Sequence, residues 1–309
     1  MSGSITLENR FGVNKMELIS LKYAIFVIVL LVLYYCFPKK YRWYVLLAGS
    51  MAYYVIICKW YVLFIIFTIC TTYGSTIWID KLLKKQNAIV KSHKEDWDRQ
   101  TRKDYKEKGR KKRVAVMLFA LLCNFGILAF LKYIPYAGEL GLLLPLGISF
   151  YTFQSMGYVM DVYREIVEPE KNFLKVALFV SFFPQIIQGP IAIYDKLAGQ
   201  LYEGHSLRLE NLQKGALLVL WGVMKKLVIA DRAVNIINFV MDKPMDFSGT
   251  YVFFAAVVYA LQLYADFSGG IDIVRGIAEM FGITMSTNFN HPYFSRSLTE
   301  YWHLSLIHI

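Results

Sequence analysis

Ionisable and small polar residues gather in one stretch of this 309-residue chain, residues 264–302, directly after the uncharged apolar run 247–265. Asp266 follows that run, and Ser268 and two glycines come next. A charged group at membrane depth costs roughly 2.5–3.5 kcal/mol on insertion scales, so it needs a partner, water or a function. Two interpretations of Asp266 are open. It caps a helix end or pairs with a lysine such as Lys225, or it orients a substrate.

Two apolar segments, residues 140–164 and 176–193, carry helix-breaking and hydrogen-bonding side chains. These are Pro145, Gly147, Ser149, Thr152, Gln154 and Ser155 in the first segment, and Pro184, Gln185, Gln188, Gly189 and Pro190 in the second. Proline removes a backbone donor, and backbone groups freed in this way cannot face lipid. Packing kinks alone explain one such segment as well as a cavity does. Two of them predict an internal cavity, and we expect Gln185, Asp266 and Asn290 to line it.

The elements that position these residues are predicted to be apolar helices. Hydrophobic residues make up 56% of the chain, which is typical of a polytopic membrane protein rather than a soluble domain. Several charge-free windows approach or exceed the roughly 17–25 residues that a spanning helix needs. They are residues 23–38, 43–58, 60–79, 114–131, 140–160, 176–194 and 247–265. The predicted fold class is therefore all-α, a polytopic membrane helix bundle.

Basic residues predict the orientation of the chain in the membrane. Residues 81–113 contain 14 Lys or Arg and 5 Asp or Glu, and so carry +9 of the formal net charge of +11. Loops rich in Lys and Arg stay cytoplasmic. We therefore predict a multi-pass plasma-membrane protein with a cytoplasmic loop at residues 81–113 and an external N-terminus. The first connection, residues 39–42, is also basic and is then internal, as the same rule requires.

The charge of the predicted loop 81–113 suits more than one partner. Anionic lipid headgroups attract such a segment by about 1 kcal/mol per basic residue, and membrane lipid is the first expectation. An acidic acyl-donor carrier or a phosphorylated cofactor is the alternative. Nucleic acid is not expected, because no stacking platform or nucleic-acid motif accompanies the basic residues.

The cysteines do not suggest a metal site. Cys36, Cys58, Cys70 and Cys123 lie within or at the end of apolar windows, without CxxC or metal-ligand spacing, so we interpret them as small buried hydrophobic residues. The chain also lacks a Walker A loop, GxGxxG, HExxH and a zinc-type Cys/His cluster. No metal site and no ATP- or dinucleotide-dependent chemistry is predicted.

Two further segments have helical periodicity. Residues 214–232 form a helix-like run interrupted by Lys225 and Lys226, which we expect to snorkel to an interface or pack around a polar centre. In residues 271–282 the charged residues share one face and the apolar residues line the other, so we expect an amphipathic helix at the surface or against the bundle. The charged residues are Asp272, Arg275 and Glu279.

Five motifs occur in order between residues 145 and 302. They are PLGISFYTFQSMGYVMDVYR, FVSFFPQIIQGPI, KKLVIADR, YADFSGGIDIVRGIAEMFGI and NFNHPYFSRSLTEYW. Five in this order resemble the membrane-bound O-acyltransferases, most of all the bacterial branch that modifies alginate and teichoic acids. We therefore expect one incomplete domain of this family. Residues 1–131 would supply plain spans and the basic loop, residues 132–302 the motif-bearing core, and residues 303–309 a tail that departs from the family.

The resemblance implies a bundle with a central funnel or tunnel. An acyl group would move from a thioester (acyl-CoA or an acyl carrier protein) to a hydroxyl of an extracytoplasmic polysaccharide or teichoic acid, with no bound cofactor. Accessory polysaccharide-modification proteins are further expected partners. Carried over from the family, Gln185, Gly189, Pro190, Asp266 and Ser268 would form the tunnel wall, and Asn288, Asn290, Ser297 and Glu300 would support it.

The same resemblance requires a base near the acceptor hydroxyl, and histidine suits this role because its ordinary pKa is near 6.5. His303 is the provisional candidate, standing three residues early for the first family histidine, unless residues 303–309 are not native. The family's second histidine, the usual base, belongs to a later helix that this sequence lacks, so we expect this sequence alone to be inactive. The other histidines are expected to be solvated (His93 and His205) or structural (His291).

A transporter or flippase for an envelope glycan is the alternative function, since it also needs broken helices around a central cavity. It is disfavoured because no inverted repeat is found and the ordered motifs favour acyl transfer. A non-catalytic membrane scaffold is the third hypothesis. By resemblance, acetyl is the first expectation for the acyl group.

Overall fold

The computed structural model describes residues 18–93, 96–133 and 144–286, together with residues 293, 295–297 and 299–300. Over these ranges the chain forms helices joined by turns and contains no strand, so the predicted all-α class is confirmed. The chain divides into two compact units. Unit 1 contains the described residues of Leu47–Ile186 and Ile193–Tyr202, and unit 2 contains those of Lys15–Leu46, Ile187–Ala192 and Glu203–Ile309.

Apolar helices long enough to cross a membrane are present. By length and composition these are Lys39–Ser92, Arg99–Tyr133 and Gly249–Met280, and shorter apolar helices cover Leu21–Cys36 and Phe173–Gln188. Large apolar side chains stand exposed on them, such as Leu122 at 72% and Phe253 at 71%. Surfaces of this kind are stable against lipid rather than water. The chain is therefore a membrane protein.

Unit 1 is built around α3 (Val62–Ser92), α4 (Arg99–Tyr133) and α6 (Ile148–Tyr163), which pack against one another. The preceding helix is α2 (Arg42–Cys58). Buried residues of α4 recur every three or four positions, at 113, 116, 120, 124, 128 and 131, because that spacing places them on one helical face. On this face Asn124 Nδ2 donates a hydrogen bond to Thr71 Oγ1 at 2.9 Å.

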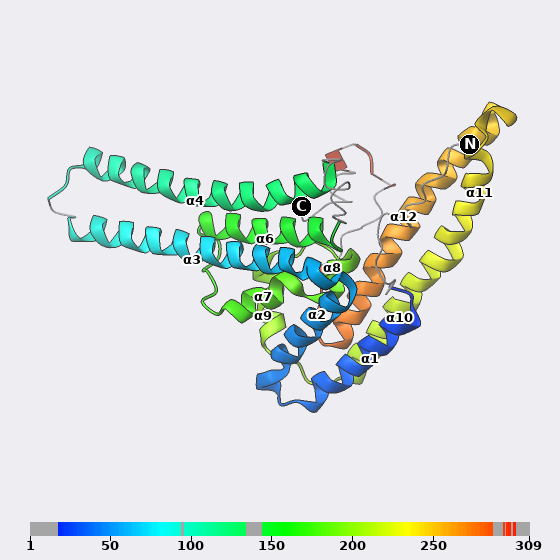
Figure 1. Cartoon of the computed structure of the whole chain (residues 1–309), viewed down its shortest axis with the longest axis horizontal. Coiled ribbons are helices and arrows are strands. Elements are labelled where there is room, and N and C mark those ends of the chain that lie inside the picture. The colour runs from blue at the N-terminus through cyan, green and yellow to red at the C-terminus, as the bar shows by residue number, and fades with distance from the viewer. Residues whose placement is uncertain are drawn as a thin grey trace. The chain divides into compact units, whose positions relative to one another are not determined.

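The prediction that residues 81–113 form a loop is wrong. Helix α3 continues to Ser92 and α4 begins at Arg99, so the connection is confined to residues 93–98. Figure 1 shows the two helices side by side on either side of this connection. Lys, Arg, Glu and Gln are good helix formers, and no proline interrupts the segment. The basic residues therefore lie on the ends of two packed helices.

The predicted break in residues 176–193 is confirmed. Helix α7 (Phe173–Ser181) ends before Phe182, and α8 (Phe183–Gln188) begins after it. Pro184 lies in the first turn of α8, where its missing N–H costs least. After α8 the chain has no regular secondary structure until α9 (Tyr194–Tyr202).

Side chains satisfy the backbone groups that this break frees. The N–H of Phe183 would normally donate to the carbonyl of Phe179 within one helix. Instead it donates to Ser50 Oγ at 3.1 Å, and Gln154 Nε2 donates to the Phe179 oxygen at 2.9 Å. Ser50, Gln154, Phe179 and Phe183 are all buried. The break is therefore built into the protein interior, as irregular backbone at membrane depth must be.

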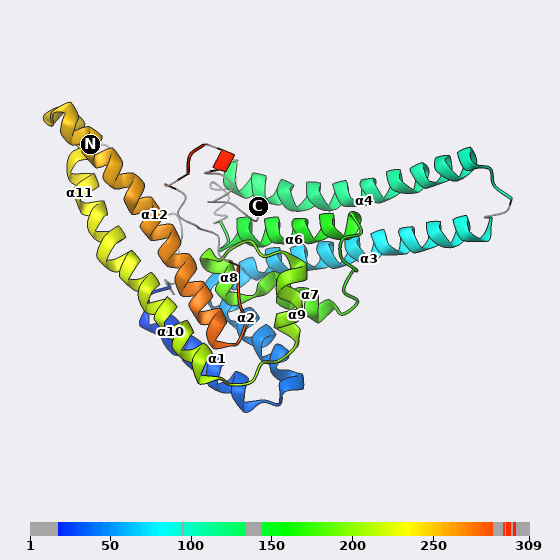
Figure 2. The same cartoon turned by 180° about the vertical axis from the view of Figure 1, so that it is seen from behind.

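Unit 2 contains α1 (Leu21–Cys36), α10 (Leu209–Met224), α11 (Asp231–Met241) and α12 (Gly249–Met280). A single π-helical turn, Lys225–Ala230, joins α10 to α11. Helix α12 packs along α10, the π-helical turn and α11 (Figure 2). Short 3-10 helices at Lys39–Tyr41, Lys59–Tyr61 and Pro244–Asp246 complete the elements of the described chain.

Helix α12 runs unbroken through Asp266 and the two glycines that follow it. The interpretation that Asp266 caps a helix end is therefore wrong. Glycine is kept in this helix by close packing: Gly222 of α10 lies against Gly269, and a Cβ on Gly269 would lie 2.8 Å from the Gly222 oxygen. Small residues let helix backbones approach one another in membranes.

Candidate functional site

A cluster of paired charges lies between α12 and the π-helical turn of unit 2. Lys225 Nζ lies 2.7 Å from Asp272 Oδ2, and Arg275 lies 3.3 Å from Asp272 Oδ1. Lys226 forms an ion pair with Asp266. Consecutive residues of an α-helix point about 100° apart, and the wider π-helical turn allows both lysines to reach α12. We call these five residues the charged seam.

Burial differs along the charged seam. The side chains of Lys225 and Asp272 are 17% and 13% exposed, whereas those of Lys226 and Asp266 are 26% and 34% exposed. Charges removed from water are stable only when they are paired. The expectation that Asp266 pairs with a lysine is therefore confirmed, with Lys226 in place of Lys225. Asp266 remains the most exposed carboxylate of the seam.

The rest of the charged face of α12 also has partners. Glu279 lies 2.9 Å from Lys214 Nζ, and its other oxygen accepts a hydrogen bond from Thr284 Oγ1 at 3.2 Å. Its side chain is only 9% exposed. Of the two placements predicted for residues 271–282, packing against the bundle is the one confirmed.

Two of the five motifs form the charged seam, and a third contacts α12 between Asp266 and Asp272. The KKLVIADR motif supplies the lysines, and the DFSGG motif supplies Asp266. Gln188 of the FPQIIQGPI motif lies against Gly270, where a Cβ would be 2.5 Å from the Gln188 Cδ. Ser268 is 4% exposed, and its hydroxyl has no hydrogen-bond partner in the described part of the chain. Because a buried hydroxyl without a partner is costly, Ser268 is suited to bind a further polar group.

The other residues predicted for the tunnel wall are buried. Gln185 is 2% exposed within α8, and Gly189 and Pro190 are buried in the irregular segment that follows. Asn288, Asn290 and His303 lie outside the described residues. A common cavity for Gln185, Asp266 and Asn290 stays a prediction.

Ser297 and Glu300 have a local role at the start of a helix. The N–H of Glu300 donates to Ser297 Oγ at 3.0 Å, and Glu300 Oε2 accepts from the N–H of Arg296 at 2.7 Å. This exchange is a variant of the capping box, in which a serine and a glutamate three residues later satisfy the first free N–H groups. Both side chains are exposed. Their support of a tunnel wall stays a prediction.

Histidines and cysteines partly follow the prediction. His93 is exposed and stacks on Trp97, whereas His205 is half-buried and its side chain lies against Gly282. Cys58 is buried, but Cys36 and Cys70 are exposed. The prediction that all the cysteines are buried is wrong, because apolar side chains of this protein also cover its outer surface.

Known proteins similar to this chain act on envelope polymers. A peptidoglycan O-acetyltransferase of Helicobacter pylori is 32% identical over 224 residues, which cover 60% of this chain and 42% of that protein. A probable alginate O-acetylase AlgI of Pseudomonas aeruginosa is 36% identical over 170 residues, which cover 53% and 32%. A teichoic acid D-alanyltransferase of Bacillus subtilis is 26% identical over 170 residues, which cover 52% and 42%. The chain is homologous to these acyltransferases.

These relatives confirm the resemblance to membrane-bound O-acyltransferases. The chain spans less than half the length of each of the three. No family model matches it. Each relative is named for transferring a small acyl group, and the polymer differs among them.

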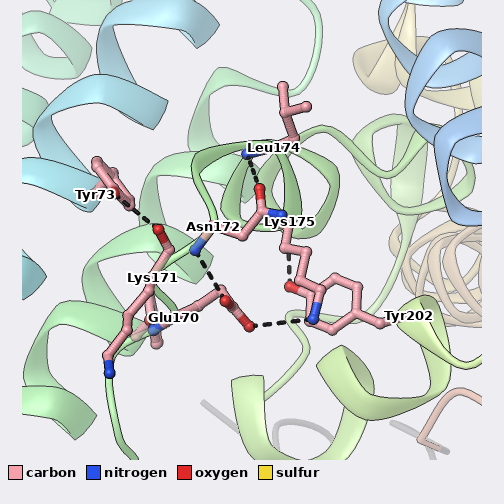
Figure 3. Close-up of polar contacts among 8 residues, drawn as sticks. Tyr73, Glu170, Lys171, Asn172, Leu174, Lys175 and Tyr202 are labelled. Atoms are coloured by element: carbon pink, nitrogen blue, oxygen red, sulfur yellow. Dashed lines mark hydrogen bonds and ion pairs between the residues drawn. The ribbon is translucent and has the colours of Figure 1, made fainter.

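A second polar cluster of this acyltransferase homologue lies in unit 1, around Glu170 (Figure 3). The carboxylate of Glu170 accepts from the N–H of Asn172 at 2.9 Å and lies 3.7 Å from Lys175 Nζ. The hydroxyls of Tyr202 and Tyr73 donate to the backbone oxygens of Lys175 and Lys171, each at 2.9 Å. These bonds tie the start of α7 to α3 and α9.

Beside this cluster lies an open pocket of about 600 Å³. Burial raises the pKa of Tyr202, and it also raises the pKa of Tyr194, so both stay protonated as hydrogen-bond donors. The lining residues are Ile166, Val167, Glu168, Pro169, Glu170, Lys171, Tyr194, Asp195, Ala198, Gly199 and Tyr202. The contacts around Glu170 stabilise the local fold of unit 1.

The sequence interpretation missed the pairing of Lys225 with Asp272 and the contact of Gln188 with Gly270. A usable signal existed in the glycines. Gly215 and Gly222 are seven residues apart on α10, as are Gly269 and Gly276 on α12, and the two pairs meet. A seven-residue spacing keeps small residues on one helical face. The glycine spacing by itself therefore indicates a close helix pair.

Proposed function

We propose that this protein is a membrane O-acyltransferase that moves an acyl group, acetyl first, from a thioester donor to a hydroxyl of an extracytoplasmic polysaccharide or cell-wall polymer. The observation that carries the proposal is the set of relatives. A peptidoglycan O-acetyltransferase, a probable alginate O-acetylase and a teichoic acid D-alanyltransferase all align with this chain. The acceptor polymer differs among these relatives, whereas acyl transfer is common to them. We therefore infer the reaction class from them and not the acceptor.

In this proposal the charged seam positions the acceptor side of the reaction. The buried pair of Lys225 and Asp272 neutralises both charges and fixes the π-helical turn against α12. The more exposed carboxylate of Asp266 can then accept a hydrogen bond from a sugar hydroxyl without giving up its ion pair with Lys226, because a carboxylate has several acceptor positions. Ser268, two residues further along α12, offers a second polar group.

The proton of the acceptor hydroxyl needs a base, and His303 is our provisional candidate. In the transfer, the hydroxyl oxygen bonds to the thioester carbonyl carbon, the base takes the hydroxyl proton, and the thiol leaves. Exclusion of water by the bundle would protect the thioester from hydrolysis. The donor would be acyl-CoA or an acyl carrier protein, and accessory polysaccharide-modification proteins and membrane lipid are proposed partners.

The proposed orientation has a cytoplasmic connection between α3 and α4 and an external N-terminus. It rests on the Lys/Arg bias of residues 81–113. The substitution Lys108→Cys, in a variant without the native cysteines, tests this orientation. Impermeant maleimide should label this cysteine only after the cells are opened. Labelling of intact cells would reverse the topology.

Deletion of the gene in its host tests the proposed activity. We expect the ester-linked acyl content of one envelope polymer to fall and to return when the gene is restored. Parallel measurement of O-acetyl groups on peptidoglycan and on secreted polysaccharide, and of D-alanyl esters on teichoic acid where present, identifies the acceptor. Unchanged acylation of every polymer, with an altered amount of polymer outside the cell, would favour a flippase instead.

A further inference from the structure

A groove of about 570 Å³ lies between the polar ends of α3 and α4. It is entirely within unit 1. The residues that line it are Leu83, Gln86, Asn87, Lys103, Lys106, Glu107, Arg110, Arg113 and Glu165. Four of these side chains are cationic and two are anionic. The groove is therefore electropositive, unlike an ordinary interface between two helices, which is apolar.

The four cations share one face of α4. Lys103, Lys106, Arg110 and Arg113 follow one another at intervals of three, four and three residues, which places them in a row along the helix. Arg113 is 2.7 Å from Glu165, so its charge is compensated. Glu107 is committed in part to Lys111, at 3.1 Å. In the described part of the chain no ion pair holds Lys103, Lys106 or Arg110.

The floor of the groove is ordered and polar. Gln86 is 6% exposed, and its Nε2 donates to the Lys106 carbonyl at 3.1 Å. Its Oε1 has no hydrogen-bond partner among the described residues. Gly109 makes this floor possible, because a Cβ there would lie 2.6 Å from the Gln86 Cδ. Gln86 therefore closes the floor against α4, and the row of cations above it suits a ligand that carries anionic groups.

The depth of the groove separates a soluble ligand from a lipid headgroup. Arg113 borders the apolar run 114–131 of α4. At about 1.5 Å per residue, Lys103 lies about 15 Å beyond Arg113 along the helix. The headgroup layer on each side of a bilayer is only about 5–8 Å thick. A headgroup can reach Arg113 and Arg110, but Lys106 and Lys103 continue the row into the aqueous phase.

We propose that this groove binds the phosphate groups of a soluble, phosphate-bearing thioester donor of the coenzyme A class. The proposal rests on the proposed acyl transfer for the identity of the donor, while the phosphate chemistry follows from the groove itself. Arg binds phosphate oxygens with two parallel hydrogen bonds, and Lys binds them as a point charge. Arg110 and Lys106 hold one phosphate, and Lys103 a second one further from the membrane.

Direct binding of coenzyme A to the purified full chain in detergent tests this assignment without requiring activity. The decisive variant is K106A/R110A, which removes two groove cations. Its matched control is K108A/K112A, which removes the same charge at the same spacing from exposed positions outside the groove. Each lost contact to a charged group should weaken binding by at least about tenfold. We therefore expect K106A/R110A to lose about a hundredfold or more, and the control to stay within about threefold.

The probes identify the ligand group and its source. Pyrophosphate should compete with coenzyme A, whereas pantetheine, which carries no phosphate, should not. Equal losses in both variants would mean diffuse attraction to the basic helices and would overturn the proposal. So would displacement of coenzyme A by phosphatidylglycerol vesicles but not by pyrophosphate, which would assign the groove to lipid headgroups. Groove-specific binding without polymer acylation in the host would refute the proposed function alone, and acylation without such binding would refute this inference alone.

Discussion

The helix pairs α3 with α4 and α10 with α12 differ in whether the charged side chains between the two helices are paired. Between α10 and α12, glycines bring the backbones together, and every lysine of the charged seam faces a carboxylate. Between the polar ends of α3 and α4, the helices leave a groove, and three cations have no ion pair among the described residues. Where the helices pack closely, as α10 and α12 do, the charged side chains are paired. Where a groove separates them, as between α3 and α4, cations stay available to a ligand.

The contrast has a simple physical origin. Where side chains are desolvated, an unpaired charge costs several kcal/mol, so only paired charges persist. Where a helix extends past the bilayer, water screens its cations, and leaving them unpaired costs little. Of the two helix pairs, α3 with α4 is the one whose described residues include unpaired cations in an accessible groove. The paired cations near α12 instead hold the carboxylates of Asp266 and Asp272.

The largest expected effect is on the buried end of the charged seam. Asp272→Asn leaves Lys225 and Arg275 without their carboxylate, and removing one partner of a buried pair costs about 3–5 kcal/mol. We expect a marked fall in Tm of the purified protein and less protein in the membrane. The double variant K225M/D272N should recover part of the loss, because it removes a stranded charge. A D272N protein as stable as the wild type would show that the seam is hydrated.

Replacing a glycine by alanine should change the free energy of unfolding in opposite directions at a tight helix contact and at open positions. A Cβ on Gly222 would lie 2.7 Å from the Ile273 Cγ1 and collide with the Gly269 backbone, so Gly222→Ala should cost about 1–3 kcal/mol by overpacking. Gly74 of α3 and Gly126 of α4 have nothing within 4 Å of a Cβ. Their replacement by Ala should stabilise the helices by up to about 1 kcal/mol. Thermal unfolding in detergent measures the change in Tm for each variant. Equal changes in Tm at Gly222 and at Gly74 or Gly126 would contradict the difference between tight and open positions.

Much of the fold could be predicted from hydrophobicity. The apolar windows place α1 to α4 and the first half of α12, because a run of apolar residues is stable as a helix in lipid whatever its neighbours are. The break near Pro184 was also predictable, since proline removes a donor. The helical ends of α3 and α4 were missed because charge was taken to indicate a loop. Their own composition, rich in Lys, Arg and Glu, favours a helix.

The site was less predictable because it depends on contacts between distant residues. No local sequence pattern predicts that Lys226 pairs with Asp266 or that Lys225 pairs with Asp272. The π-helical turn decides both, by widening one turn of the helix so that two consecutive lysines reach α12. The close contact of Gly269 with Gly222 likewise joins residues that are distant in the sequence.

Asp266→Asn should have a smaller effect on stability and a clear effect on function. The Asp266 and Lys226 side chains are about a third and a quarter exposed, so losing this pair should cost about 1 kcal/mol or less. In the host, a D266N gene should restore protein in the membrane but not polymer acylation. Lys226→Met is the control: an equal loss would mean that Asp266 acts only through its ion pair. Full acylation by D266N would make Asp266 structural.

The smallest effect is expected at Asp80 of α3, which pairs with the exposed Lys84. The two side chains meet at 2.5 Å, and Asp80 is 16% exposed whereas Lys84 is 63% exposed. An i,i+4 pair of this kind, with the acid nearer the helix N-terminus, contributes about 0.3–0.5 kcal/mol. Asp80→Asn should therefore lower Tm only slightly, and the difference should shrink as salt rises, because solvent screens exposed pairs. A loss as large and as insensitive to salt as that of D272N would mean that α3 is desolvated here, and the groove above it could not then keep its cations unpaired.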